Sequence, residues 1–344
     1  IPANTFDYWV SLEKVTIPDH VTSVGQNAFY GCENLKEVSI GKGVTAITGA
    51  VFGDCPSLTS LTLPASVLVV NSNAFYCGDW NYTNTLSELR FMGNAPLIAA
   101  DAFKGVTATV YYSANNASWT EDIFQDYGGT ITWAADAGIP GGTAGSDVVT
   151  VDGGDCGEAV TWTLNSEGTV TVSGTGEMTS APWWTDYRTV IKKVVIEEGV
   201  TNVYSRAFYQ CTSLAEVSLP STLTKIGSEA FDSCSALTAV VLPEGVTTLG
   251  MDAFENCSKL DHVTIPSTLT SLGSWSLSCG TIDNLYITSL EQWCGLNLAG
   301  SYVQIGNLYV NGELLTELVI PENMTSIPAN TFDYWVSLEK VTIP

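Results

Sequence analysis

Side chains able to do acid, base or nucleophilic chemistry near neutral pH are scarce in this sequence of 344 residues. Histidine is the side chain whose ordinary pKa suits proton transfer at that pH. Only His20 and His262 occur, and neither has an obvious nucleophile partner in the sequence, so we interpret both as solvated residues. A Gly-x-Ser-x-Gly nucleophile elbow is absent. Cys294, which follows Trp293, could be a lone reactive thiol, but buried packing is the favoured interpretation.

Metal and cofactor motifs are equally weak. Asp152, Asp155 and Glu158 surround a Gly-Gly pair, but the set spacing and distal bidentate acid of an EF-hand calcium loop are missing. No cysteine pair has the Cys-x-x-Cys spacing of a zinc site. The segment Gly174-Thr-Gly176 lacks the third glycine and the following helix of a dinucleotide loop. The sequence therefore predicts no catalytic residue, no metal site and no cofactor, and hence no enzyme.

Composition excludes further functional classes. Acidic residues outnumber basic ones by 36 to 12, which gives a formal net charge of −24. Nucleic-acid binding needs stripes of Lys and Arg against the phosphates, so this class of partner is disfavoured, as are anionic membrane surfaces. No apolar run reaches the length of about 18 residues expected of a membrane span. An apolar content of 45% with 14% charged residues is the opposite of a disordered composition.

The cysteines are spaced for architecture rather than for reactivity. Cys211, Cys234 and Cys257 are 23 residues apart, and Cys32 and Cys55 keep the same step. Free cysteine is among the most buried residue types, so a stacked column of buried thiols is the favoured interpretation. Stacked strands lie about 4.8 Å apart, within the range of a disulfide, but parallel Cβ vectors fit such a bond poorly.

The same 23-residue period organises most of the chain. Phenylalanines mark it at Phe6, Phe29, Phe52, Phe75, Phe208, Phe231 and Phe254. Each repeat has two short strand patterns, Leu-x-x-Val-x-Ile and Val-x-x-Ile, with Gly, Pro and polar residues at the corners. An Ala-Phe pair between them is expected to begin a short helical or 3₁₀ turn. Such a period predicts a β-rich solenoid whose rungs bury one another's apolar faces.

The first array is expected to end in irregular structure. Residues 1–78 are repeats, and 79–135 are interpreted as an irregular repeat and a cap that closes the end of the stack. Within this cap we expect strands over Thr107–Tyr112 and 128–133 and a short helix over Trp119–Tyr127. Residues 136–147 are Gly-rich and are interpreted as a linker.

A second array follows the linker. Residues 148–190 predict a β-hairpin around Asn165–Gly168 and an N-terminal cap in which Pro182–Trp184 plugs the solenoid. Repeats are then expected at 191–282 and 321–344, on either side of an atypical rung at 283–320.

A longer period is superimposed on the short one. Residues 1–18 read IPANTFDYWVSLEKVTIP, and residues 327–344 are identical, at an offset of 326 residues (327 minus 1). The 23-residue repeats share only a consensus, so this identity is of a different kind. We interpret the chain as a window of a longer tandem array of modules. An engineered duplication is the alternative.

The repeat consensus, Val-Thr-x-Ile-Gly-x-x-Ala-Phe-x-x-Cys-x-x-Leu-x-x-Val-x-Ile-Pro, resembles the BspA-like leucine-rich repeats of bacterial surface proteins. Val21–Ile40 and Leu223–Leu242 carry it nearly whole. The units at 156–178 and 108–133 also resemble those that precede and close such repeats in gut Firmicutes proteins. The resemblance implies a leucine-rich repeat solenoid, secreted and exposed on the bacterial cell surface, used for adhesion or as a scaffold. It brings no catalytic residues, and Ser276-Leu277 departs from its Ala-Phe pair.

Two surfaces are candidates for binding. Solenoids usually bind through the outward positions of their strands, which here include Glu37, Glu216 and His262. A strip of tyrosines, Tyr30, Tyr76 and Tyr209, follows the repeat phenylalanines at the turn edge. These tyrosines could bind a partner, or they could pack on neighbouring rungs, which is the favoured interpretation.

The leading hypothesis is a structural protein in which tandem modules form an extracellular fibre or stalk. Its expected partners are adjacent modules of the same kind. The alternative is an adhesin that binds host matrix or glycoprotein through the solenoid surface.

Overall fold

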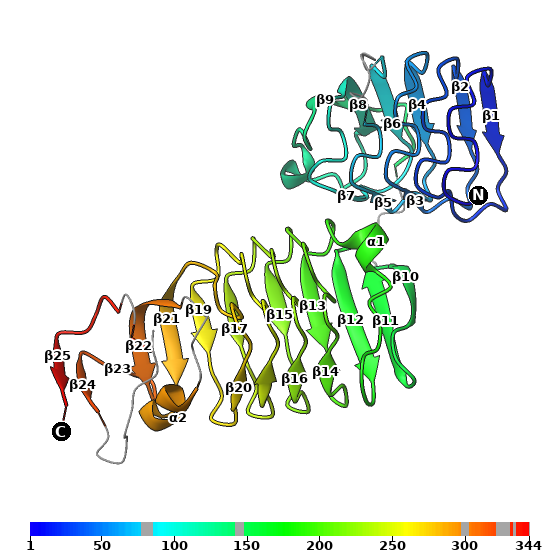
Figure 1. Cartoon of the computed structure of the whole chain (residues 1–344). Coiled ribbons are helices and arrows are strands. Elements are labelled where there is room, and N and C mark those ends of the chain that lie inside the picture. Colours follow the sequence, from blue (N-terminus) through cyan, green and yellow to red (C-terminus); the bar gives the residue numbers. More distant parts are fainter. Residues whose placement is uncertain (77–84, 142–147, 297–302, 321–330, 333–334, 344) are drawn as a thin grey trace. The chain divides into compact units, whose positions relative to one another are not determined.

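The protein folds into two compact units, each of which is a coil of short strands (Figure 1). The computed structural model describes residues 1–76, 85–141, 148–296, 303–320, 331–332 and 335–343. Unit 1 comprises Ile1–Val151 with Asn165–Glu167, and unit 2 comprises Asp152–Leu164 with Gly168–Pro344. The architecture confirms the predicted β-rich solenoid. Among the described residues, no helix is long or apolar enough to cross a membrane.

Unit 1 is built from parallel strands that are stacked rung on rung. One set of strands is β1 (Lys14–Ile17), β2 (Glu37–Ile40), β4 (Ser60–Leu63), β6 (Glu88–Phe91), β8 (Thr107–Ser113) and β9 (Thr130–Asp136). A second, shorter set is β3 (Ala46–Ile47), β5 (Val69–Val70) and β7 (Leu97–Ile98). The 3₁₀ helix η1 covers Glu121–Ile123, so the helix expected over Trp119–Tyr127 is only one short turn. Strand β9 runs one residue into the segment expected as a linker.

Unit 2 begins with a hairpin and continues as a parallel coil. Its first strands are β10 (Thr150–Asp155), β11 (Val160–Asn165), β12 (Thr169–Gly174), β13 (Lys193–Ile196) and β15 (Glu216–Ser218). Further along are β17 (Ala239–Val241), β19 (His262–Thr264), β21 (Thr281–Ile287), β22 (Gln304–Val310), β23 (Glu313–Leu314), β24 (Glu317–Val319) and β25 (Lys340–Thr342). The shorter strands are β14 (Asn202–Val203), β16 (Lys225–Ile226), β18 (Thr248–Leu249) and β20 (Ser271–Leu272). Helix α1 covers Trp184–Tyr187 and helix α2 covers Leu290–Gly295.

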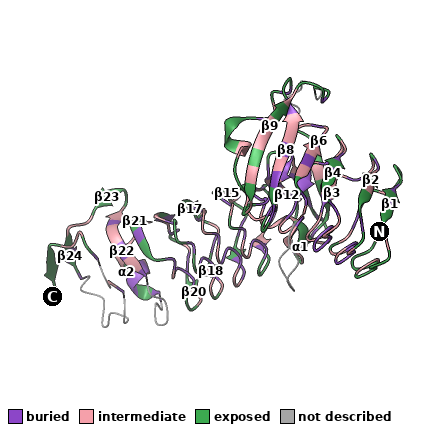
Figure 2. Cartoon of the chain, turned by 90° about the horizontal axis from the view of Figure 1, so that it is seen from above, coloured by how far each residue is buried: buried purple, intermediate pink, exposed green. Residues whose placement is uncertain are grey.

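The strand register reproduces the sequence period. Lys14 pairs with Glu37 and Lys193 with Glu216, each at a step of 23 residues. Ser60 pairs with Glu88, a step of 28 (88 minus 60), so five additional residues lie between these strands. Residues 77–84, which include the start of the segment expected as an irregular repeat, lie outside the described residues. Apolar positions alternate inward along strands such as β1 and β4, and Figure 2 shows buried residues interspersed with exposed ones along the chain.

The Ala-Phe segments are turns, so the expected helical or 3₁₀ conformation was wrong. In the clean repeats the residue before each Ala-Phe pair has a positive φ, as at Arg206 (60°), Glu229 (55°) and Asp252 (57°), which no right-handed helix accommodates. Alternate backbone N–H groups instead donate to the next rung, as from Phe208 to the Ala230 carbonyl at 2.8 Å. Rungs approach so closely here that a Cβ on Gly250 would lie 2.4 Å from the Ser228 nitrogen. Glycine in the consensus is therefore a packing requirement.

Aromatic residues lie over the ends of the stacks. In unit 2 the hairpin of β11 and β12 brings Trp162 against the fully buried Trp183, whose ring stacks on Phe208 at 5.3 Å. In unit 1 the ring of Trp133 contacts both Trp119 and Phe124, beside β9. These aromatic groups cover the apolar edge of a terminal rung, which would otherwise face water.

The atypical rung has longer strands than its neighbours, with seven residues in β21 and in β22 against three in β19, but it stays in register. Strands β21 and β22 are parallel over their length, with Leu285 opposite Leu308. Helix α2 lies between them and is capped by Ser289, whose hydroxyl accepts a hydrogen bond from the Gln292 backbone N–H at 3.2 Å. Asn311 and Gly312 both have positive φ values and form the tight turn that folds β23 back on β22.

Candidate functional site

The phenylalanine and cysteine positions form the interior of the coil. Successive rings stack at 5.1–5.8 Å, with interplanar angles of 5–15°, in the pairs Phe6–Phe29, Phe29–Phe52, Phe208–Phe231, Phe231–Phe254 and Phe75–Phe103. The thiols of Cys32, Cys55, Cys234 and Cys257 each donate to the carbonyl of the phenylalanine one rung earlier, at 3.1–3.3 Å. Cys211 is also fully buried. Apart from Phe6, which is half-buried, these side chains are out of reach of a ligand.

The described cysteines are buried, and burial suppresses the chemistry of their thiols. Burial raises the pKa of Cys156 and Cys294 to about 11 and that of Cys279 to about 12. It raises the pKa of Cys234 and Cys257 well above the usual range. Because the thiolate is the nucleophile, none of these residues is activated near neutral pH. The buried position and raised pKa of Cys294 therefore indicate that its thiol packs in the core.

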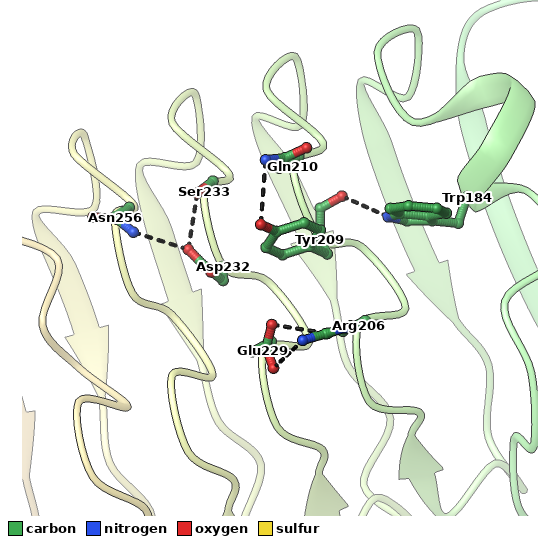
Figure 3. Close-up of polar contacts among 8 residues, drawn as sticks. All are labelled: Trp184, Arg206, Tyr209, Gln210, Glu229, Asp232, Ser233 and Asn256. Atoms are coloured by element: carbon green, nitrogen blue, oxygen red, sulfur yellow. Dashed lines mark hydrogen bonds and ion pairs between the residues drawn. The ribbon is translucent and has the colours of Figure 1, made fainter.

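The turn edge holds the predicted tyrosines, and each has a packing partner. Tyr209 stacks on Trp184 at 6.4 Å, and the Trp184 indole donates to the Tyr209 carbonyl at 3.1 Å (Figure 3). Gln210 donates to the Tyr209 hydroxyl at 3.3 Å. Tyr30 donates to the Asp54 carboxylate at 2.5 Å, and the Lys104 ammonium lies over the Tyr76 ring at 5.2 Å.

An acidic group lies along the same edge in unit 2. Arg206 makes a bidentate pair with Glu229 at 2.8 Å, and Asn256 donates to Asp232 at 3.1 Å (Figure 3). Partial burial, together with the charges of Asp252, Asp232 and Glu229, raises the pKa of Glu255. Among the residues that the structure describes, no three metal-ligating side chains come together. Asp152, Asp155 and Glu158 are exposed.

Along the outward strand face, the predicted acidic residues pair across rungs. Lys14 contacts Glu37 at 2.6 Å, and Lys193 contacts Glu216 at 2.7 Å. The hydrogen bond and charge of Lys14 lower the pKa of Glu37. Exposed pairs of this kind contribute little to stability, and they fix cross-rung partners rather than a ligand pocket.

His262 lies in a different environment, which we call the tyrosine–asparagine surface and define as His262, Asn284, Asn307, Tyr286 and Tyr309. These residues occupy neighbouring outward positions of β19, β21 and β22. The two tyrosine rings stack at 4.6 Å with an interplanar angle of 17°. The two tyrosines and two asparagines are half-buried, so the stacked rings and adjacent amides form a partly exposed platform for a ligand with both apolar faces and hydroxyl or amide groups.

A hydrogen-bonded row runs beside the rings and fixes the tautomer of His262. Asn307 Nδ2 donates to Asn284 Oδ1 at 3.3 Å. Asn284 Nδ2 lies 3.1 Å from His262 Nε2, and an amide nitrogen only donates, so Nε2 is the acceptor. His262 Nδ1 then carries the proton and donates to Asp261 at 2.6 Å. The imidazole is therefore held in place by two neighbours.

Sequence reasoning placed His262 on a binding face but missed the tyrosines and asparagines. Their signal was present, since Asn-Leu-Tyr-Ile at 284–287 recurs as Asn-Leu-Tyr-Val at 307–310, 23 residues later. The two copies lie in the atypical rung, where the consensus no longer indicates which face a residue occupies. A third outward group is in unit 1, where Arg90 pairs with Glu88 and Asp136 at 2.7 Å and lies over Tyr111.

Comparison with known proteins identifies the repeats. Residues 1–127, 187–294 and 303–344 match the BspA type leucine rich repeat region in six copies. No curated protein matches the chain. Among solved structures, a leucine rich cell surface protein from Faecalibacterium prausnitzii is 19% identical with a TM-score of 0.30, covering 85% of this chain and 84% of that one.

Two further solved structures are similar at the same level. A leucine-rich repeat protein from Bacteroides ovatus is 16% identical with a TM-score of 0.32, over 89% of this chain and 87% of that one. The pneumococcal vaccine antigen PcpA is 18% identical with a TM-score of 0.33, over 91% of this chain and 69% of that one.

Proposed function

The chain belongs to the BspA-type leucine-rich repeat proteins, and from this premise we propose that it is a non-enzymatic structural protein of the bacterial cell surface, in which tandem modules form an extracellular fibre or stalk. The observation that carries the proposal is the identity of residues 1–18 with residues 327–344. A repeat identical over 18 residues at a 326-residue step joins one module to the next without interrupting the 23-residue coil.

The physical properties of the solenoid support a mechanical role. Each rung contacts its neighbours through a stacked aromatic and aliphatic core, so stiffness accumulates with the number of rungs. The excess of 24 negative charges opposes lateral association of neighbouring fibres. The buried thiols and the lack of a metal-ligating group among the described residues favour a structural role over catalysis.

Electron microscopy of the cell envelope tests this proposal. Antibody raised against the purified chain should decorate extended surface structures, and the native gene should encode several copies of the 326-residue module. A native protein that carries one module and lies inside the cell would refute it.

A second candidate function is adhesion, and the tyrosine–asparagine surface favours it. The stacked rings of Tyr286 and Tyr309 and the amides of Asn284 and Asn307 suit the apolar faces and hydroxyl groups of a host glycoprotein. The full chain should bind immobilised matrix glycoproteins saturably, and Tyr286→Ala with Tyr309→Ala should weaken binding at least 10-fold. Thr264→Ala on the same face is the matched control. Equal binding by all variants would refute this function.

A further inference from the structure

We propose that a groove in unit 1 binds a neutral oligosaccharide. The groove lies beside β2 and β4, where the parallel ladder of the outward strand face is interrupted. It belongs to unit 1, whereas the tyrosine–asparagine surface belongs to unit 2. The inference therefore adds a ligand-binding site to the structural role proposed above and does not depend on that role.

The strand pairing shows where the ladder is interrupted. Strand β1 pairs with β2, and β4 pairs with β6. Next to these pairs, the Lys36 backbone N–H donates to the Glu13 carbonyl at 2.9 Å, and the Ser87 N–H donates to the Thr59 carbonyl at 2.9 Å. Strands β2 and β4 are both described in full, and no pairing joins one to the other. The sheet on this face is therefore divided between two successive rungs.

The division is confined to the outward face, because the same two rungs are joined elsewhere. On the shorter strands, β3 pairs with β5. At the corner before these strands, the Ser66 hydroxyl donates to the Val44 carbonyl at 2.7 Å. On the turn edge, the Phe29 N–H donates to the Val51 carbonyl at 3.1 Å. The rungs are therefore held together around the division, and a ligand meets a preformed groove, which lowers the entropic cost of binding.

The division leaves apolar side chains partly exposed. In β4 the inward residues Leu61 and Leu63 are buried. In β2 the corresponding residues Val38 and Ile40 are only half-buried, and both line the groove. They give the groove an apolar floor. A ligand that covers this floor gains the free energy of removing apolar surface from water.

Hydroxyl and amide groups lie beside the apolar floor. The groove has a volume of about 1000 Å³, at the upper end of the range for ligand-binding pockets. Its lining includes Ser39 and Thr62, at exposed outward positions of β2 and β4, and Asn94, at the corner after β6. The buried Asn116 donates to Asn94 Oδ1 at 2.9 Å, which fixes the Asn94 amide and leaves its Nδ2 group as a donor for a ligand.

The charges of the lining favour a neutral ligand. Among the described residues that line the groove, Asp19 and Lys42 alone are charged, and the Lys42 backbone N–H donates to Asp19 Oδ1 at 2.9 Å. These opposite charges balance, and the net charge of −24 on the chain opposes anionic ligands such as nucleic acids. A neutral saccharide offers C–H faces to the apolar floor and hydroxyl groups to the polar side chains. An oligosaccharide therefore suits the length and lining of the groove.

NMR of methyl-labelled methionines in the intact chain tests the proposal. Met92 lines the groove, whereas Met251 is half exposed in unit 2 and serves as an internal control. Titration with maltohexaose, cellohexaose or mannohexaose at millimolar concentration should shift the Met92 resonance saturably and leave the Met251 resonance in place. If none of the three saccharides shifts Met92, or if both resonances shift equally, the inference is overturned.

A double variant connects binding to the lining. Ser39→Ala with Thr62→Val removes two hydroxyl groups and nearly keeps the side-chain shapes, so the affinity should fall about 10-fold through the lost hydrogen bonds. The matched control is Thr16→Val, because Thr16 lies opposite Ser39 on β1 but outside the lining of the groove. It should bind as the parent does. Circular dichroism checks that each variant folds. A folded double variant with the parent's affinity, or an equal loss in Thr16→Val, would contradict the inference.

Discussion

Replacing Phe231 with alanine should destabilise unit 2 by removing a ring from the middle of the stacked phenylalanine column. The ring is fully buried and lies between Phe208, at 5.3 Å and 13°, and Phe254, at 5.1 Å and 5°. Removing a buried phenylalanine costs about 3–5 kcal/mol through lost burial and the cavity that remains. The two ring pairs, each contributing about 0.5–1.5 kcal/mol, place the Phe231→Ala variant near the upper end of that range. We expect a loss of about 5 kcal/mol in the free energy of unfolding of unit 2.

Because each rung contacts only its neighbours, the loss should be local as well as large. Hydrogen exchange should increase most for the backbone N–H groups of rungs 208, 231 and 254, while unit 1 keeps its protection. Urea unfolding followed by circular dichroism gives the magnitude. Phe231→Leu, which keeps most of the volume, should lose less than half as much. A destabilisation of Phe231→Ala below about 1 kcal/mol would refute the view that the aromatic column carries the core.

Three further predictions follow from single side chains. The described cysteines should resist a thiol reagent at pH 8 in the native chain and react once urea unfolds it, as measured by mass spectrometry; rapid labelling of Cys234 in the folded protein would contradict their burial. Ser276 is fully buried and its hydroxyl lacks a partner, so Ser276→Ala, which restores the repeat consensus, should stabilise unit 2 by about 1 kcal/mol in urea titration. The pKa of Glu255 is raised in the folded state, so the folded chain binds a proton at this carboxyl group more tightly than the unfolded chain does. Proton binding therefore stabilises the fold at low pH, and this stabilisation is lost as the pH rises through the folded-state pKa. Glu255→Gln should therefore raise the melting temperature by about 1 °C at pH 7 and leave it unchanged at pH 3.5, and equal shifts at both pH values would contradict this assignment.

The 23-residue period was sufficient to predict how strands pair. A parallel coil with that step places Lys14 opposite Glu37 and Val194 opposite Val217, and both pairs are observed. The hairpin predicted around Asn165–Gly168 is also confirmed, because strict alternation on both sides of a turn signal leaves few alternatives. These features depend on local pattern and spacing, which the sequence displays directly.

The Ala-Phe turn could not be predicted in the same way. A prediction from local sequence considers only hydrogen bonds within the same segment. In this turn, alternate backbone N–H groups donate instead to carbonyl groups of the next rung. Only the stacked neighbour makes the positive φ values at Arg206 and Glu229 acceptable. The tyrosine–asparagine surface was missed for a related reason. Asn284 and Tyr286 become neighbours of Asn307 and Tyr309 only through the register of β21 and β22.

Burial in a solenoid is therefore a property of neighbours rather than of residues, and the duplicated rung demonstrates this within one molecule. A residue scale assigns Ile17 and Ile343 the same tendency to be buried, yet their exposed fractions are 2% and 73%. The free energy that separates them comes from burial against the neighbouring rung that packs on Ile17.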